Sequence, residues 1–266
     1  MTFLEDFLIN HKIVDGEMLR KNSKQHCILT GMILGNGNIS YIDSSWKCIE
    51  LKVGRYLTRF YPGFSPKEIT HICEKYKSFV ETPKTFKIIE GDELKESYYL
   101  KNYVPNNGTL SNSCMRYKKC QNKDFFKIYG DNAKMLIMVP NRGRRLLGRA
   151  ILWEIDGKII MDRVYSIENY VEHQFYNYAK SKNWIILNRN SYTCSCQHDS
   201  QNWLIPEDNY TTPISLNFTL QLKEKCKNYP FMDSFCYLNK EENVLSTFPF
   251  VDGYRLQTTC GYKYAY

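Results

Sequence analysis

Apolar and polar residues follow the most regular pattern in the middle of the chain, between residues 134 and 187. Three short apolar runs separated by turns come first, then a stretch with apolar residues at steps of three and four, and then a last apolar run. Runs of the first kind are typical of strands and the second pattern is typical of an amphipathic helix. The dipeptide Asp156-Gly157 favours positive φ and predicts a two-residue hairpin turn. The predicted elements are strands at 135–139, 146–153, 159–165 and 184–187 and a helix around 171–179.

Regular patterns also flank this region. Ser65, Pro66 and Glu68 combine an N-cap, a proline at the first helical position and a capping-box partner, and they predict a helix that runs to about Val80. Strict alternation at 216–222, followed by short apolar runs between turn residues, predicts a terminal antiparallel meander.

The predicted fold class is therefore α+β, with a mixed central sheet, an N-terminal α+β region and a C-terminal meander. We assign residues 1–104 to the N-terminal region and 105–190 to the core. Residues 191–266 form a C-terminal β-rich region that we expect to be one compact unit with the core.

The order strand, strand, strand, helix, strand over 134–187 resembles the central half of acyl-CoA-dependent N-acetyltransferases of the GNAT family. In that family an Arg/Gln-x-x-Gly-x-Gly/Ala loop lies before the helix and binds the coenzyme A pyrophosphate with backbone N–H groups. Here that junction is 165–170, which contains no glycine and carries Glu168. The letters of the loop do occur at 145–150, but within a predicted strand. We therefore expect a degenerate acetyltransferase-like core that binds no coenzyme A, and we expect no other cofactor.

Three further motifs are Ser-Cys-Met-Arg at 113–116, Gly-Arg-Ala-Ile-Leu-Trp at 148–153 and Met-Asp-Arg-Val-Tyr at 161–165. On these motifs the chain, from about residue 50 to its end, resembles a group of tailed-phage proteins. This resemblance implies a phage or viral origin and no particular mechanism.

The charge balance favours an anionic partner. The chain has 36 Lys and Arg against 28 Asp and Glu, a formal net charge of +8, and such an excess attracts anions at long range. Arginines of the turn at 142–145 suit phosphate, because the guanidinium donates two parallel hydrogen bonds. Tyr117 or Trp153 could stack a base. A soluble charged turn is the alternative interpretation. The candidate basic residues for nucleic acid or another partner are Arg142, Arg144, Arg145, Arg149, Arg116, Lys118 and Lys119.

Asp162 and Arg163 are neighbouring charges in an otherwise apolar strand. Alternation sends them to opposite faces, so one of them points to the buried side. If Asp162 does so, it needs a partner such as Arg116 or Arg149, because an unpaired buried carboxylate is costly. A buried ion pair and a ligand-binding cleft both remain open. Cys114 could be a nucleophile whose thiolate is stabilised by Arg116 or Lys118, or a small core residue.

No catalytic or metal site stands out. Cys194, Cys196 and His198 lack the spacing of common zinc sites, so we expect no metal. The ten cysteines are expected to be reduced, because no secretory signal or membrane span is visible. These features favour a phage- or viral-type binding protein in the cytoplasm of an infected host cell, or in the virion, that engages nucleic acid or a host or viral protein through the basic hairpin. The alternatives are a divergent acyl- or aminoacyl-transferase, with a splayed cleft between the strands that contain Trp153 and Leu187, and a virion structural component.

Overall fold

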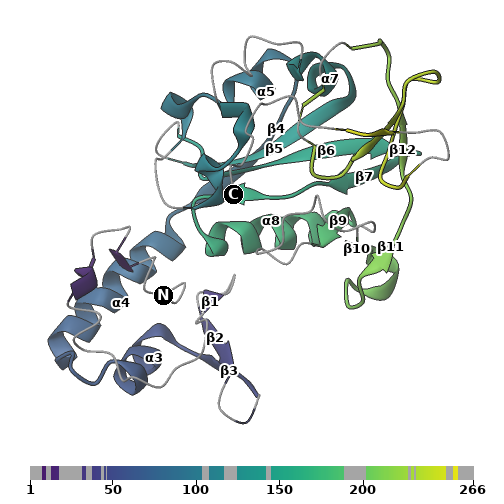
Figure 1. Cartoon of the computed structure of the whole chain (residues 1–266). Coiled ribbons are helices and arrows are strands. Elements are labelled where there is room, and N and C mark those ends of the chain that lie inside the picture. Colours follow the sequence, from purple (N-terminus) through teal and green to yellow (C-terminus); the bar gives the residue numbers. More distant parts are fainter. Residues whose placement is uncertain are drawn as a thin grey trace, which may run out of the picture.

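The central element of the fold is a mixed sheet with helices on both faces (Figure 1). The computed structural model describes residues 8–9, 13–17, 32–33, 38–42, 45, 47–103, 108–116, 125–141, 145–188, 202–226, 229–230, 232–249 and 254–256. The fold is α+β, as predicted.

Within the described residues, the central sheet has eight strands in the order β11-β10-β9-β7-β6-β5-β4, with β8 paired to β6. All pairs are antiparallel except β7 and β9, which are parallel and are joined by helix α8 (Asn169–Ser181). This arrangement confirms the predicted order of three strands, a helix and a returning strand. The strands are β4 (Lys84–Ile89), β5 (Ala133–Pro140), β6 (Gly148–Ile155), β7 (Lys158–Met161), β8 (Tyr165–Ser166), β9 (Ile185–Asn188), β10 (Asn202–Leu204) and β11 (Ile214–Ser215).

The predicted strand at 159–165 is interrupted by a bulge. β6 pairs Leu152 with Met161 and, further along, Arg149 with Tyr165. Two residues of β6 therefore lie opposite the three residues 162–164, so the outer strand holds one residue more, as in a β-bulge. The turn before this strand is as predicted, because Asp156 and Gly157 both have positive φ, at 50° and 73°.

Helices cover both faces of the sheet (Figure 1). α8 packs on one face, where the ring of Phe175 lies against Phe86 with centroids 5.0 Å apart. The other face is covered by α5 (Asp92–Glu96), the 3-10 turns η1 (Leu100–Asn102), η2 (Thr109–Ser111) and η3 (Cys114–Arg116), and α7 (Phe125–Asn132). Because Gly148 contacts α8 and its neighbour Arg149 bonds to Ser97 after α5, alternate residues of β6 serve the two faces.

In the described residues, the N-terminal region contains a small antiparallel sheet and the helices α3 (Val53–Phe60) and α4 (Pro66–Glu81), besides helical residues at 8–9 and 16–17. The capping box at Ser65 is present, and the hydroxyl and backbone N–H of Ser65 hold the pKa of Glu68 below its ordinary value. Lys84 caps the C-terminal end of the helix that begins after Ser65, because its Nζ donates to the carbonyls of Phe79 and Thr82 at 2.9 and 3.0 Å. The strands of the small sheet are β1 (Met32–Ile33), β2 (Ile39–Ile42) and β3 (Cys48–Leu51).

The C-terminal region forms an antiparallel sheet in the order β12-β14-β13-β15, preceded by the 3-10 turn η5 (Pro206–Asp208). It docks on the central sheet through Phe235, whose ring meets that of Trp153 edge-on at 5.0 Å. The strands are β12 (Thr219–Gln221), β13 (Tyr237–Asn239), β14 (Val244–Ser246) and β15 (Tyr254–Arg255). None of the helices in the described ranges has the length and apolar character needed to cross a membrane.

Gly148 tests the packing of α8 on the sheet. A Cβ at this position would lie 2.7 Å from Cε2 of Phe175 and 3.0 Å from Cγ1 of Val171, both buried on α8. We expect Gly148→Ala to lower the free energy of unfolding by about 1–3 kcal/mol through overpacking. The control is Gly130→Ala on α7, where no atom lies within 4 Å of the added Cβ, and which should stabilise the protein by about 0.5–1 kcal/mol. Equal effects of the two substitutions in urea unfolding would contradict the packing described.

Candidate functional site

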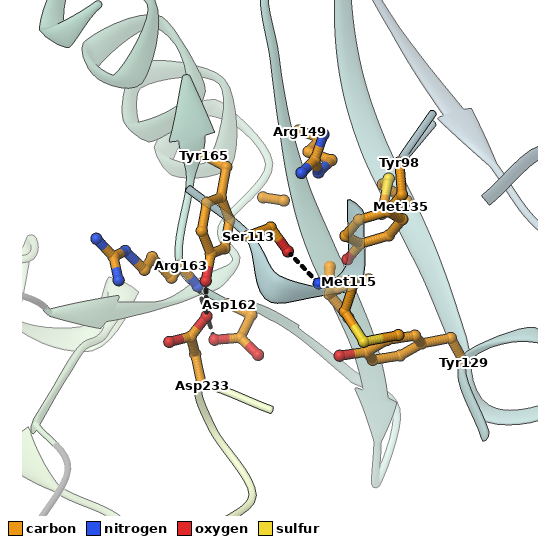
Figure 2. Close-up of a pocket in the computed structure, with 12 residues that line it drawn as sticks. Tyr98, Ser113, Met115, Tyr129, Met135, Arg149, Asp162, Arg163, Tyr165 and Asp233 are labelled. Carbon is orange, nitrogen blue, oxygen red and sulfur yellow. Dashed lines mark hydrogen bonds between the residues drawn. The ribbon is translucent and has the colours of Figure 1, made fainter. Parts of the chain in front are cut away.

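The three sequence motifs meet at one cavity, although the first lies more than 30 residues before the other two (Figure 2). The first motif contributes Ser113 and Met115, the second contributes residues 149–151, and the third contributes Asp162, Arg163 and Tyr165. Tyr98, Tyr129, Met135 and Asp233 complete the lining. About 20 Å³ is accessible to the centre of a water-sized molecule. A volume of this size holds about one water molecule, so the cavity is too small for a substrate as it stands.

Arg149 lies at the centre of this site and is only 1% exposed. Its Nη1 donates to the Ser97 carbonyl at 3.1 Å and its Nη2 to the Leu110 carbonyl at 3.2 Å. Its guanidinium lies over the ring of Tyr98 at 4.2 Å from the centroid and also faces the rings of Tyr103 and Tyr165. Burial lowers the pKa of Arg149, whereas the neighbouring tyrosines act in the opposite direction. The cation is therefore held by π faces and carbonyls.

The prediction that Arg149 belongs to an exposed basic patch is wrong. The pleat of β6 turns this side chain away from α8, toward the face that α5 and η2 cover. Trp153 cannot stack a base either, because it is fully buried on the same face.

Asp162, the first residue of the bulge, is the member of the charged pair that turns inward. It is 4% exposed, and its carboxylate accepts hydrogen bonds from the Trp153 indole N–H at 3.2 Å and the Arg163 backbone N–H at 2.7 Å. Arg163 is only partly buried, and its guanidinium lies 5.0 Å from the centroid of the Tyr165 ring. The bulge thus buries the Asp162 carboxylate at the cavity, while Arg163 also lines the cavity but stays partly exposed.

Tyr165 links the cavity to the C-terminal region. Its ring lies between Arg149 and Arg163, and its hydroxyl donates to Oδ2 of Asp233 at 2.7 Å (Figure 2). Burial, together with the nearby Asp233 carboxylate, raises the pKa of Tyr165 well above its ordinary value. Sequence reasoning missed Asp233, because no local pattern connects it to a tyrosine 68 residues away.

The junction between β8 and α8, where acetyltransferases bind pyrophosphate, is filled by the protein itself. Gly108 lies so close that an added Cβ would meet the Ile167 carbonyl oxygen at 2.2 Å. The Thr109 hydroxyl accepts the Ser166 N–H at 3.0 Å, and the Ile167 N–H donates to the Leu147 carbonyl at 2.9 Å. The N–H groups of Ser166 and Ile167 are therefore bonded within the protein and are not free to bind a phosphate.

The structure gathers some predicted site residues and leaves others apart. Arg116 is partly buried in η3, and Arg145 is exposed at the end of the β5–β6 turn. The backbone of Cys114 lies in η3, but its side chain is outside what the structure describes. The residues Arg142, Arg144, Tyr117, Lys118, Lys119, Cys194, Cys196 and His198 lie outside the described residues. Within the described ranges no three His, Cys, Asp or Glu side chains lie together as metal ligands would.

Comparison of the chain with family models, with curated proteins and with solved structures gives no match. Around the cavity Arg149 donates to two backbone carbonyls, Asp162 accepts from the Trp153 indole and Asp233 accepts from Tyr165, and these bonds fix the surrounding elements relative to one another.

The pH dependence of stability tests the surroundings of Tyr165, which is partly buried and bonded to Asp233. A tyrosine of the unfolded chain ionises near pH 10, while the raised pKa keeps Tyr165 neutral in the folded protein. The contribution of Tyr165 to the free energy of unfolding is therefore complete below about pH 10. As the pH rises further this contribution is lost, by up to about 1.4 kcal/mol per pH unit. We expect Tyr165→Phe to lower the free energy of unfolding at neutral pH by about 1–2 kcal/mol, because the bond to Asp233 is lost. Above pH 10 the variant should lose stability more slowly than the unaltered protein. Parallel stability curves in urea unfolding from about pH 8 to 11 would show that Tyr165 titrates normally.

Proposed function

We propose that the protein is a binding protein that engages nucleic acid through the arginine-rich turn between β5 and β6, which contains Arg142, Arg144 and Arg145. The observation that carries this proposal is the contrast within one hairpin: Arg145 is exposed at the turn, while Arg149 is buried at its base. The resemblance of the three motifs to tailed-phage proteins favours a phage- or viral-type role in an infected host cell.

The base of the turn is fixed to its surroundings on both sides. The Asn141 N–H donates to the Pro83 carbonyl at 3.0 Å, and the Leu146 N–H donates to the Asn102 carbonyl at 2.8 Å. The Leu147 N–H bonds across the hairpin to the Met138 carbonyl at 2.8 Å. A preorganised base reduces the entropy that the turn loses on binding, and arginine matches phosphate geometry. The net charge of +8 adds long-range attraction.

Two observations favour binding over catalysis. The cavity at the motifs has room for about one water molecule, and at the β8–α8 junction the N–H groups of Ser166 and Ile167 bond to the Thr109 hydroxyl and the Leu147 carbonyl. A donor held in the manner of coenzyme A would have to displace residues 108–109.

One observation favours a second function, a divergent acyl- or aminoacyl-transferase. β7 and β9 pair only at Ile160–Ile185 and Met161–Ile186, after which the chain bends through the bulge toward β6. The parallel strands β7 and β9 therefore separate beyond Met161. The cleft expected from the sequence was between the strands of Trp153 and Leu187, but β7 lies between those two strands, so the separation is between β7 and β9. Saturable binding of acetyl-CoA would favour this function. A virion component, the third alternative, would co-purify with particles.

The triple variant Arg142→Glu, Arg144→Glu, Arg145→Glu tests the basic turn. We expect its dissociation constant for an oligonucleotide to rise at least about tenfold near 0.1 M salt, because phosphate contacts are replaced by repulsion. The slope of log affinity against log salt concentration should become shallower by about 2, at about 0.7 for each of the lost contacts to a single strand.

The matched control is the triple variant Lys158→Glu, Lys180→Glu, Lys182→Glu. Lys158 is exposed at the start of β7, at the end of β6 away from the basic turn, and Lys180 and Lys182 are exposed at the C-terminal end of α8. Fluorescence anisotropy with labelled oligonucleotides gives both quantities. Equal losses in the two triple variants would mean that net charge acts alone, and unchanged binding in the first variant would rule out the turn.

A further inference from the structure

We infer that the partner is a single-stranded nucleic acid and that Tyr99 is the residue on which a base stacks. This inference rests on the proposed function of the basic turn and specifies its partner. The surface in question, called here the tip surface, consists of Arg145 with Tyr99, Leu100 and Lys101.

The backbone brings these residues together although they lie more than 40 positions apart in the sequence. Tyr103 and Leu146 form a parallel bridge, and the Leu146 N–H donates to the Asn102 carbonyl. Because paired strands run about 4.8 Å apart, this bridge places Arg145 opposite Asn102 and close to Lys101. The 3-10 turn η1, fixed by the Asn102 N–H bonded to the Tyr99 carbonyl at 2.8 Å, completes the surface.

The side chains of the tip surface combine cations with exposed apolar area. Leu100 is 56% exposed, one of two large hydrophobic side chains so exposed in the described part of the chain. Arg145 and Lys101 are exposed and Tyr99 is partly exposed, with the Lys101 Nζ 5.8 Å from the Tyr99 ring centroid. Its neighbour Tyr98 is buried under Arg149 and has no such role.

Cations beside an aromatic ring are the combination that sequence-tolerant single-strand binding uses, with the charges following the backbone and the ring stacking a base. A duplex keeps its bases stacked on each other and offers a ring nothing comparable. An acidic peptide would satisfy Arg145 and Lys101 but would gain little from Tyr99. Of the two aromatic residues expected from the sequence to stack a base, Trp153 is buried and Tyr117 lies outside the described residues. Tyr99 is a described, partly exposed ring beside a cation, and we assign the stacking role to it.

The test compares Tyr99→Ala, Tyr99→Phe and the full unaltered chain by fluorescence anisotropy, on oligothymidylate of about 12 nucleotides and on a duplex of equal length. We expect Tyr99→Ala to weaken binding to the single strand about fivefold or more, with the salt slope unchanged because no charge is altered. Tyr99→Phe keeps the ring and should bind like the unaltered protein. Tyr176→Ala, which removes a partly buried tyrosine of α8, is the matched control and should have no effect.

The outcomes separate this inference from the proposed function. If Tyr99→Ala binds the single strand as tightly as the unaltered protein while the triple arginine variant does not bind, the basic turn stands and the stacking role of Tyr99 fails. Equal affinity for the single strand and the duplex would also overturn the inference. Absence of binding to both the single strand and the duplex overturns both proposals. Tight binding of polyglutamate that is independent of Tyr99 would also overturn both. A thermal midpoint of Tyr99→Ala equal to that of Tyr99→Phe shows that a loss of binding is not a loss of folding.

Discussion

The buried guanidinium of Arg149 is the interaction on which the described core depends. It joins β6 to the end of α5 through Ser97 and to η2 through Leu110, and it lies on the ring of Tyr98. Burying a cation costs several kcal/mol unless its surroundings compensate. Here two carbonyls and three tyrosine rings do so, with cation–π contacts of about 2 kcal/mol when desolvated. Removal of the guanidinium would leave buried carbonyls without a donor and a gap between the sheet and its cover.

The bulge after β7 is the second constraint. One extra residue turns Asp162 toward the Trp153 indole and places Tyr165 between two arginines, from where its hydroxyl reaches Asp233. Residues of three separate motifs and of the C-terminal region are thereby fixed around one small cavity. The turn that carries Arg145 leads into β6 next to this region, and its base is held by the separate bonds of Asn141 to Pro83 and of Leu146 to Asn102.

Local patterns predicted much of the fold. The capping box at Ser65 gave the start of α4, the Asp-Gly dipeptide gave the turn between β6 and β7, and apolar periodicity gave the strands and α8. The role of Arg149 could not be predicted in this way, because it depends on which segment covers a face of β6. Asp233 and the approach of Gly108 to Ile167 are likewise contacts between distant segments. Adjacent charges at 162 and 163 in an apolar strand were the one local sign of the bulge.

The most direct test of this account is the free energy of unfolding of Arg149→Lys, measured by urea denaturation beside Arg145→Lys as the exposed control. Lysine keeps the charge but lacks the planar fork that donates to two carbonyls while it stacks on tyrosine. We expect a loss of about 2 kcal/mol or more at position 149 and almost none at position 145. Equal stability of Arg149→Lys and the unaltered protein would contradict the central place of the Arg149 guanidinium.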